Sequence, residues 1–109
     1  MILFSPMSDP AAKIVVVIPA YNEAATIREL TKRVLQIVPD LVVVDDGSTD
    51  ATSEQLAGLP LVLVRNERNL GKAASLWKGF EHALARGAQF VVTLDGDGQH
   101  RPEDIPRLL

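Results

Sequence analysis

The stretch KIVVVIPAYNE, residues 13–23, decides the fold of this 109-residue chain. Five β-branched residues follow one another from Ile14 to Ile18, without the alternation of polar and apolar side chains that marks a strand with one wet face. A continuous run of this kind is typical of a strand buried on both faces, as in a parallel sheet. Three more short apolar runs follow at 41–45 (LVVVD), 61–65 (LVLVR) and 90–94 (FVVTL). The sequence therefore predicts four buried strands.

The segments between these strands carry helical patterns. Apolar residues recur at spacings of three and four between 27 and 38, which predicts an amphipathic helix. We expect Asn22 to cap its N-terminus and Pro39 to stop it. A short helix is expected over 51–56, a longer one over 72–86, and the beginning of another over 101–109.

The helix predicted over 72–86 has an apolar face formed by Ala73, Trp77, Phe80 and Leu84. This spacing is that of a helix packed on a sheet, so the face is expected to point inward, with Trp77 in the core. His82 would then lie on the exposed side of the helix.

Strands and helices alternate in the order βαβαβαβ, with a further helix beginning after the last strand. This order predicts an α/β fold with a mostly parallel sheet and right-handed crossovers. We interpret residues 1–12 as a loose leader and residues 13–109 as the N-terminal part of one domain. Because the last helix has hardly begun when the sequence stops, the domain is expected to be incomplete at its C-terminus.

Composition narrows the class of protein. Hydrophobic residues make up 47% of the chain, enough for a core, and the net charge of −3 argues against a nucleic-acid-binding protein, which needs a basic face. The absence of cysteine excludes disulfides and thiolate metal sites. No apolar stretch approaches the ~20 residues of a membrane span, and the opening segment lacks the basic lead and the long apolar run of a secretory signal. These features favour a cytoplasmic location.

Polar residues and glycines gather after the predicted strands and not before them. The segments AYNE, DDGSTD, NERNLGK and DGDGQH follow the four strands in turn, whereas the segments that enter strands are ordinary turns. In open α/β sheets, ligands bind outside the carboxyl ends of the strands. The sequence therefore places a candidate binding site at this edge of the sheet.

Two adjacent carboxylates, Asp45 and Asp46, stand at the end of the second predicted strand. Their burial would cost desolvation and mutual repulsion, and hydrogen-bond donors of a ligand would relieve that cost. Asp46 is therefore a candidate acceptor for a nucleobase or a ribose hydroxyl. The alternative is a turn at Asp46 and Gly47, with a side chain from 48–50 capping the next helix.

A second pair of carboxylates, Asp95 and Asp97, directly follows the last predicted strand. Oxygen ligands of this kind suit Mg²⁺ or Mn²⁺, and the neighbouring glycines would let a phosphate approach the backbone. The alternative is that DGDG forms only a turn, because Asp and Gly both tolerate unusual backbone angles.

Acidic residues are concentrated in the loops after the strands. Half of the 14 acids of the chain lie there, namely Glu23, Asp45, Asp46, Asp50, Glu67, Asp95 and Asp97. Such a pocket would repel a bare diphosphate, whereas a divalent ion would reverse the local sign and bridge carboxylates to phosphate oxygens. The distribution of charge therefore favours a metal.

Two residues at this edge leave the interpretation open. Tyr21 could pack over a nucleobase or cover the edge of the sheet, and Lys72 could contact phosphate or be a solvated charge. His100 is interpreted as a surface residue. Several well-known signatures are absent, because no Walker A loop, no G-x-G-x-x-G after the first strand and no G-x-S-x-G are found in the sequence.

Four segments together resemble the family 2 glycosyltransferases in order and spacing: VVVIPAYNEAATI, LVVVDDGSTDAT, NLGKAAS and LDGDGQHRPEDI. The resemblance covers nearly everything from Lys13 onward. It implies a Rossmann-like GT-A fold and a nucleotide-diphosphate sugar (UDP- or GDP-sugar) as donor. The last segment resembles most the branch that includes dolichol-phosphate mannosyltransferases and bacterial polyprenyl-phosphate glycosyltransferases, enzymes of the cell envelope.

The resemblance also implies roles for individual residues. The residues that would line the nucleotide-sugar site are Pro19, Ala20, Tyr21, Glu23, Val44, Asp46, Lys72, Asp95, Gly96 and Asp97. Within this set, Asp46 would accept a hydrogen bond from the base. Asp95 and Asp97 would hold Mg²⁺ or Mn²⁺ with help from Gln99. The implied reaction inverts the anomeric centre by in-line displacement, with the metal-bound diphosphate leaving.

The general base and the acceptor-binding elements of that family lie further along the chain than residue 109. These 109 residues are therefore expected to hold the donor part of a site and to be inactive alone. The implied acceptor is a polyprenyl phosphate or a saccharide, and membrane association, at the cytoplasmic face, would come through downstream segments.

Other classes of protein fit the residues less well. A phosphoacceptor receiver domain would place its acids after the first strand, where this chain has PAYNE. A sugar nucleotidyltransferase would need a glycine-rich loop with basic residues at the same place. A non-catalytic nucleotide-binding fragment stays open as an alternative.

Overall fold

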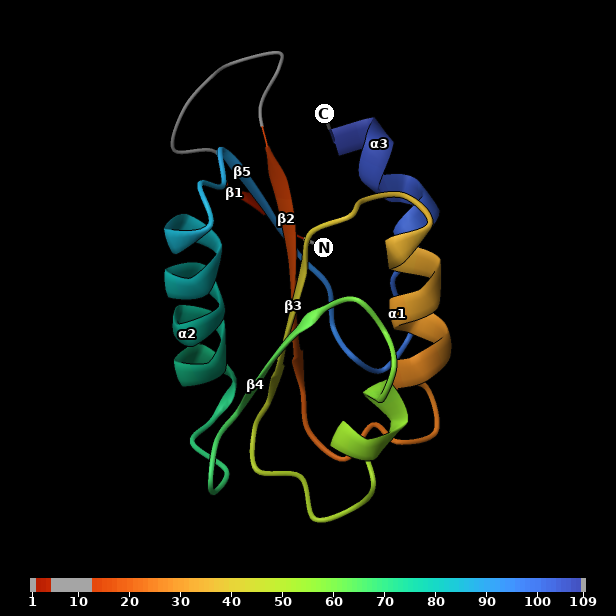
Figure 1. Ribbon diagram of the computed structural model, residues 1–109, viewed down its shortest axis with the longest axis vertical. Helices are drawn as coiled ribbons and strands as arrows, with labels where there is room; N and C mark the ends of the chain where they lie inside the picture. Colours follow the sequence, from red (N-terminus) through yellow and green to blue (C-terminus); the bar gives the residue numbers. More distant parts are fainter. Residues whose placement is uncertain (1, 5–12, 109) are drawn as a thin grey trace.

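The computed structural model describes residues 2–4 and 13–108, and these form a five-stranded sheet with helices on both faces (Figure 1). In chain order, the strands are β1 (Ile2–Phe4), β2 (Ile14–Ala20), β3 (Leu41–Asp45), β4 (Val62–Arg65) and β5 (Phe90–Thr93). Their order across the sheet is β1-β5-β2-β3-β4. The strands β5, β2, β3 and β4 run parallel, and β1 pairs antiparallel with β5. The predicted α/β fold with a mostly parallel sheet is confirmed.

The helices divide between the two faces of the sheet, as Figure 1 shows. One face is covered by α2 (Lys72–Ala85). The other carries α1 (Ile27–Leu35), the short 3₁₀ helices η1 (Ser53–Leu56) and η2 (Pro102–Asp104), and α3 (Ile105–Leu108). All four predicted helical segments are present. Pro102 stands at the start of η2, where its missing N–H costs no hydrogen bond.

Each buried strand contributes side chains to two hydrophobic cores, one on each face of the sheet. This explains why polar and apolar residues do not alternate along it. On β2, Val16 and Ile18 pack with α1, whereas Val15 and Val17 pack on the side of α2. All five residues of β3 are buried. A strand covered on both faces gains from apolar residues at every position. The prediction of burial on both faces is thus confirmed for β2, β3 and β5. It is wrong for β4, which lies at the edge of the sheet and alternates between partly buried and exposed residues.

The prediction that Trp77 lies in the core is wrong. Its side chain is 66% exposed, and the residues of α2 that are buried are Ser75, Gly79 and Ala83. The helix lies so close to the sheet that a Cβ atom added at Gly79 would stand 2.2 Å from Cγ1 of Val17. Small residues permit this close approach, and the large side chains of Trp77 and Leu84 are left exposed, whereas Phe80 is partly buried against the core.

Three local predictions also differ from the structure. Asn22 is not the N-cap of α1, because the helix begins after Thr26 and Asn22 adopts a left-handed conformation (φ +52°). The helix ends at Leu35, before it reaches Pro39. Residues 2–4, which the sequence assigned to a loose leader, form β1, and the rest of that leader lies outside the described residues.

The topology creates a crevice between β2 and β5. From β2 the chain builds outward through β3 to β4, and then α2 carries it back to the other side of β2. The strand order therefore reverses between β2 and β5, and the loops after these two strands lie side by side at one edge of the sheet. Such a switch point is where ligands bind in open α/β sheets.

Candidate functional site

A cavity of about 340 Å³ lies at this switch point, beyond the carboxyl ends of β2 and β5. It is lined by Pro19, Ala20, Tyr21, Glu23, Asp46, Asn69, Gly71, Lys72, Ser75, Asp95, Gly96 and Asp97. Nine of the ten residues predicted for a nucleotide-sugar site are among them. Val44 is not, because it is fully buried in the core on the α2 side, and neither is Gln99, the third residue predicted for the metal.

The loops after β2 and β3 are joined by a set of hydrogen bonds centred on Asn22. Its side-chain oxygen accepts hydrogen bonds from the backbone N–H groups of Thr49 (2.8 Å) and Asp50 (3.3 Å). Its own N–H donates to the hydroxyl of Ser48 (2.9 Å). We call this set the Asn22 clasp. It explains why AYNE and DDGSTD both carry small polar residues: each loop satisfies the backbone of the other.

Replacing Asn22 with alanine is expected to lower the free energy of unfolding by about 1–2 kcal/mol, because alanine loses the clasp and tolerates the left-handed conformation poorly. Asn22→Gly should cost less, since glycine adopts this conformation freely. Urea unfolding followed by circular dichroism measures both. Equal losses in the two variants would show that backbone strain plays no part, and no loss in either would contradict the clasp.

Asp45 is fully buried, and the protein supplies its donors. One carboxylate oxygen accepts the N–H of Ser48 (3.0 Å), and the other accepts the hydroxyl of Ser53 and lies 3.9 Å from Nε of Arg65. The hypothesis that a ligand must relieve the cost of burying this carboxylate is therefore wrong. Ser48, Thr49 and Asp50 do not cap η1 either, because Thr52 occupies its N-cap position.

Asp46 is 4% exposed and is likewise satisfied within the chain. Its oxygens accept hydrogen bonds from the N–H of Leu70 (2.7 Å), the N–H of Gly71 (2.9 Å) and the side-chain amide of Asn66 (2.9 Å). Burial acts to raise the pKa of Asp46, but these hydrogen bonds outweigh it and hold the pKa below its ordinary value. Asp46 thus shapes the cavity by fixing the segment 66–71 against the end of β3.

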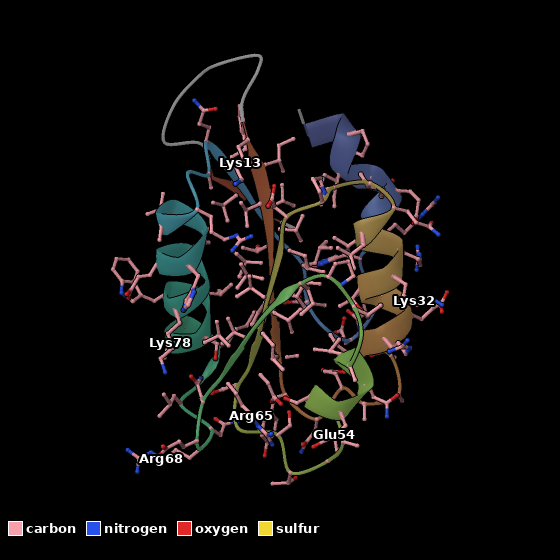
Figure 2. All side chains as sticks on the ribbon, viewed as in Figure 1. Lys13, Lys32, Glu54, Arg65, Arg68 and Lys78 are labelled. Atoms are coloured by element: carbon pink, nitrogen blue, oxygen red, sulfur yellow. The ribbon has the colours of Figure 1, made fainter. Side chains whose placement is uncertain are left out.

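Gly47 allows the segment 66–71 to come this close. It has a φ of +70°, and a Cβ atom there would lie 2.3 Å from the backbone carbon of Arg68. Figure 2 places Arg68 at the outer tip of this segment, away from the sheet. The close contact brings Asn69 and Gly71 to the cavity wall.

Sequence reasoning missed Asn66, Asn69 and Ser75. The amide of Asn66 donates to Asp46 and to the hydroxyl of Ser75 (3.2 Å), while its oxygen accepts from Nζ of Lys78 (2.5 Å). The segment NERNLGK contains the two asparagines, but asparagine is also common in ordinary turns after strands, so its presence there does not indicate a site.

The cavity concentrates negative charge around one cation. Burial raises the pKa of Glu23 above its ordinary value, and the negative charges of Asp97, Asp50 and Asp95 act in the same direction. Lys72 donates a hydrogen bond to Asp95 (Nζ to Oδ1, 2.5 Å), and this contact lowers the pKa of Asp95. The site therefore has the electrostatic character of a cation-binding pocket that holds a lysine.

The loop after β5 is held against the loop after β2. The hydroxyl of Thr26 donates to the carbonyl of Gly96 (2.8 Å), and a Cβ atom at Gly96 would lie 3.2 Å from that of Ala20. Asp97 is exposed, and one of its oxygens accepts the N–H of Gln99 (3.0 Å). DGDG thus forms a turn, and both Asp95 and Asp97 line one cavity, so the turn is compatible with a metal site.

The donor set suits a hard divalent ion that shares its coordination with a ligand. Within residues 2–4 and 13–108, no group of three or more His, Asp or Glu side chains is placed to hold a metal alone. Asp95 and Asp97 offer carboxylate oxygens in the cavity, and Mg²⁺-type ions are commonly held by one or two carboxylates together with phosphate oxygens and water. The residues fit such a shared site and do not form a complete cage.

Within residues 2–4 and 13–108, no helix is long and apolar enough to cross a membrane.

Three comparisons with known proteins agree on the family. The model of the family Glycosyl transferase family 2 matches residues 15–109. An uncharacterized protein of Methanocaldococcus jannaschii is 41% identical over 102 residues, which cover 87% of this chain and 44% of that protein. The undecaprenyl-phosphate 4-deoxy-4-formamido-L-arabinose transferase of Salmonella choleraesuis is 35% identical over 112 residues, which cover 92% of this chain and 33% of the relative.

Solved structures show the same fold. Glucosyl-3-phosphoglycerate synthase from Mycobacterium tuberculosis, in complex with Mn²⁺, UDP and glucosyl-3-phosphoglycerate, superimposes with a TM-score of 0.72 at 30% identity. The match covers 88% of this chain and 38% of that one, so the chain spans less than half the length of the relatives it matches. These neighbours are GT-A glycosyltransferases, which confirms the predicted GT-A fold. With a family match that runs from β2 to the last residue, this chain belongs to glycosyl transferase family 2.

Proposed function

We propose that this chain forms the donor-binding part of a glycosyltransferase that takes a sugar from a nucleotide diphosphate. The observation that carries the proposal is the cavity itself, which is lined by Tyr21, Lys72 and the carboxylates of Asp95 and Asp97 at the switch point of the sheet. Support also comes from the M. tuberculosis neighbour, whose structures hold UDP or UDP-glucose with Mn²⁺. A nucleoside diphosphate has the matching chemistry: an aromatic base, a ribose and an anionic diphosphate.

The residues of the cavity divide by chemistry. Tyr21, which is 43% exposed and lines the cavity, offers an aromatic face to a base. Asp95 and Asp97 would hold Mg²⁺ or Mn²⁺, with Gln99 nearby in sequence as the third predicted ligand. The bound ion would neutralise the charge on the leaving diphosphate. Lys72 adds a positive charge on the same side.

Asp46 has a structural role beside the contact with the base that the sequence predicts. Its carboxylate already accepts three hydrogen bonds from the segment 66–71, which leaves at most one further acceptor position. A hydrogen bond from the nucleobase would have to use that position. We propose that Asp46 acts mainly by holding Asn69 and Gly71 in the wall of the cavity.

The acceptor and the reaction are proposed from the relatives. The arabinose transferase of S. choleraesuis is named for undecaprenyl phosphate, so a polyprenyl phosphate is the proposed acceptor. Inversion at the anomeric carbon is proposed from the resemblance of the sequence motifs to family 2. A phosphate acceptor is already anionic and needs little help from a general base. The general base, the acceptor site and any membrane contact at the cytoplasmic face are proposed to lie in parts of the family fold that these 109 residues do not contain.

Titration with UDP and with GDP by calorimetry, with and without Mn²⁺, tests the proposal and identifies the preferred nucleobase. Replacing Asp97 with alanine is expected to weaken metal-dependent nucleotide binding at least about tenfold, because a carboxylate ligand is lost. Asp97 is exposed, so the variant should keep its fold, as circular dichroism can check.

Asp40→Ala is the matched control, since it removes a carboxylate at the opposite end of β3 and should bind like the wild type. A folded wild-type chain that binds neither nucleotide with Mn²⁺ would contradict the proposal. Binding that Asp97→Ala leaves unchanged would contradict the assignment of the metal.

A further inference from the structure

The contact between Lys72 and Asp95 raises a question about the order of binding. Among the described residues that line the cavity, Lys72 carries the only positive charge, and its ammonium stands 2.5 Å from Oδ1 of Asp95. Asp95 is one of the two carboxylates proposed to hold the metal. The ammonium therefore occupies one of the two oxygens that Asp95 could offer to a metal.

A lysine and a divalent ion cannot share this oxygen at close range without strong repulsion. A metal bound to the other oxygen, Oδ2, would still stand within a few ångströms of the ammonium, so we expect Lys72 to move away when a metal binds Asp95. Its position permits this, because the side chain of Lys72 is 62% exposed and that of Asp95 is 36% exposed. Ion pairs with this exposure contribute little stability, so breaking the pair costs little.

The backbone of Lys72 is held in place, whereas its side chain can change rotamer. Lys72 is the first residue of α2, and the N–H of the preceding Gly71 is held by Asp46. The four-carbon stem of lysine can swing its ammonium over several ångströms without any change in the helix. A diphosphate in the cavity would offer the ammonium a stronger anionic partner than one carboxylate.

We propose that Lys72 is an exchangeable counter-ion: it neutralises Asp95 in the free protein and transfers to the diphosphate of the donor when metal and nucleotide bind. This inference rests on the proposed function. It makes Lys72 a positioning residue that controls when the metal site becomes available. Metal alone then binds weakly, nucleotide alone binds weakly, and each strengthens the other by the same factor.

The structure favours exchange over a permanent structural pair. A structural ion pair is expected to be buried or bound into a network, like Asp45 with Ser48, Ser53 and Arg65. The pair between Lys72 and Asp95 is partly exposed, and both of its members line the cavity wall. The charge of His100 also acts on Asp95 and helps to lower its pKa, so Lys72 is not the only group that compensates this carboxylate.

The test compares the wild type with Lys72→Met, which keeps the apolar stem and removes the charge. Binding of Mn²⁺ without nucleotide is measured from the electron paramagnetic resonance signal of the free ion. Binding of UDP and GDP, with and without Mn²⁺, is measured by calorimetry. In Lys72→Met, the affinity for Mn²⁺ alone should rise at least about threefold, and the affinity for metal-free nucleotide should fall by a similar factor.

Lys32→Met is the control for net charge. Lys32 lies on the outer side of α1, where Figure 2 shows it pointing away from the sheet, and its replacement changes the overall charge equally. It should leave both affinities unchanged. Circular dichroism confirms that each variant is folded.

The outcomes separate this inference from the proposed function. If the wild type binds nucleotide and Mn²⁺ cooperatively but Lys72→Met has unchanged or lower affinity for Mn²⁺ alone, the counter-ion exchange is wrong and the donor site stands. If the folded wild type binds no nucleotide with Mn²⁺, the donor site is wrong and the exchange falls with it. Opposite changes in the two affinities, seen only in Lys72→Met, are the result that we expect.

Discussion

Replacing Asp46 with alanine is expected to lower the free energy of unfolding by about 3–5 kcal/mol. Asp46 is 4% exposed, and its carboxylate accepts three hydrogen bonds, two of them from the part-buried backbone N–H groups of Leu70 and Gly71. Alanine removes the acceptor and leaves the donors of Asn66, Leu70 and Gly71 in place. Asp46→Asn should be only partly better, because its amide brings a donor toward these donors.

Urea unfolding followed by circular dichroism measures this loss. Asp40→Ala is the control: its carboxylate lies 3.8 Å from Lys13 and 3.7 Å from Arg86, and partly exposed pairs of this kind are worth under about 1 kcal/mol. A loss for Asp46→Ala as small as that of the control would show that the hydrogen bonds seen at Asp46 do not hold the segment 66–71.

The dependence on pH gives a second measurement for the same carboxylate. The folded protein holds the pKa of Asp46 below its unfolded value, so the unfolded state binds more protons between the two values. The contribution of Asp46 is therefore fully present above the unfolded pKa and is lost as the pH falls through the folded one. In Asp46→Ala, this part of the loss of stability in acid should be missing.

Replacing Gly79 with alanine is expected to destabilise the protein by about 2 kcal/mol, although the same change in an ordinary helix would stabilise it by about 0.5–1 kcal/mol. The added Cβ would stand 2.2 Å from Cγ1 of Val17, which is fully buried in β2. Neither the strand nor the helix can move apart without opening the core between them. The sign of the effect therefore tests the close packing of α2.

A second substitution supplies the control. Val17→Ala removes the methyl group that meets the new Cβ, so the double variant should recover part of what Gly79→Ala loses. Unfolding free energies of both single variants and the double variant give the coupling. Additive losses, or a stabilised Gly79→Ala, would contradict the contact.

The strands and the edge that carries the site could be predicted because they depend on local sequence. Five consecutive β-branched residues in β2 strongly favour a buried strand. The polar loops after each strand lie at the carboxyl ends of the strands, which is where open α/β sheets bind ligands. This is why nine of the ten predicted residues line one cavity.

What the sequence could not show depends on distances between segments. Trp77 appeared to belong to the core because its face of α2 is the more hydrophobic one, and only the packing distance set by Gly79 reverses this. Asp46 appeared to need a ligand because its donors come from a loop more than twenty residues away. Asn22 serves a neighbouring loop in the same manner and caps no helix. Hydrogen bonds between loops leave no periodic pattern for sequence reasoning to find.

The exposure of Trp77 determines what fluorescence can report on this protein. It is the single tryptophan of the chain, and with 66% of its side chain in water its emission should resemble that of an unfolded chain. Unfolding will then shift the emission maximum very little, and ligands in the cavity, which Trp77 does not line, will hardly change it. A blue shift will instead report whatever comes to cover the outer side of α2, so this residue is a ready optical probe of contacts made by that helix.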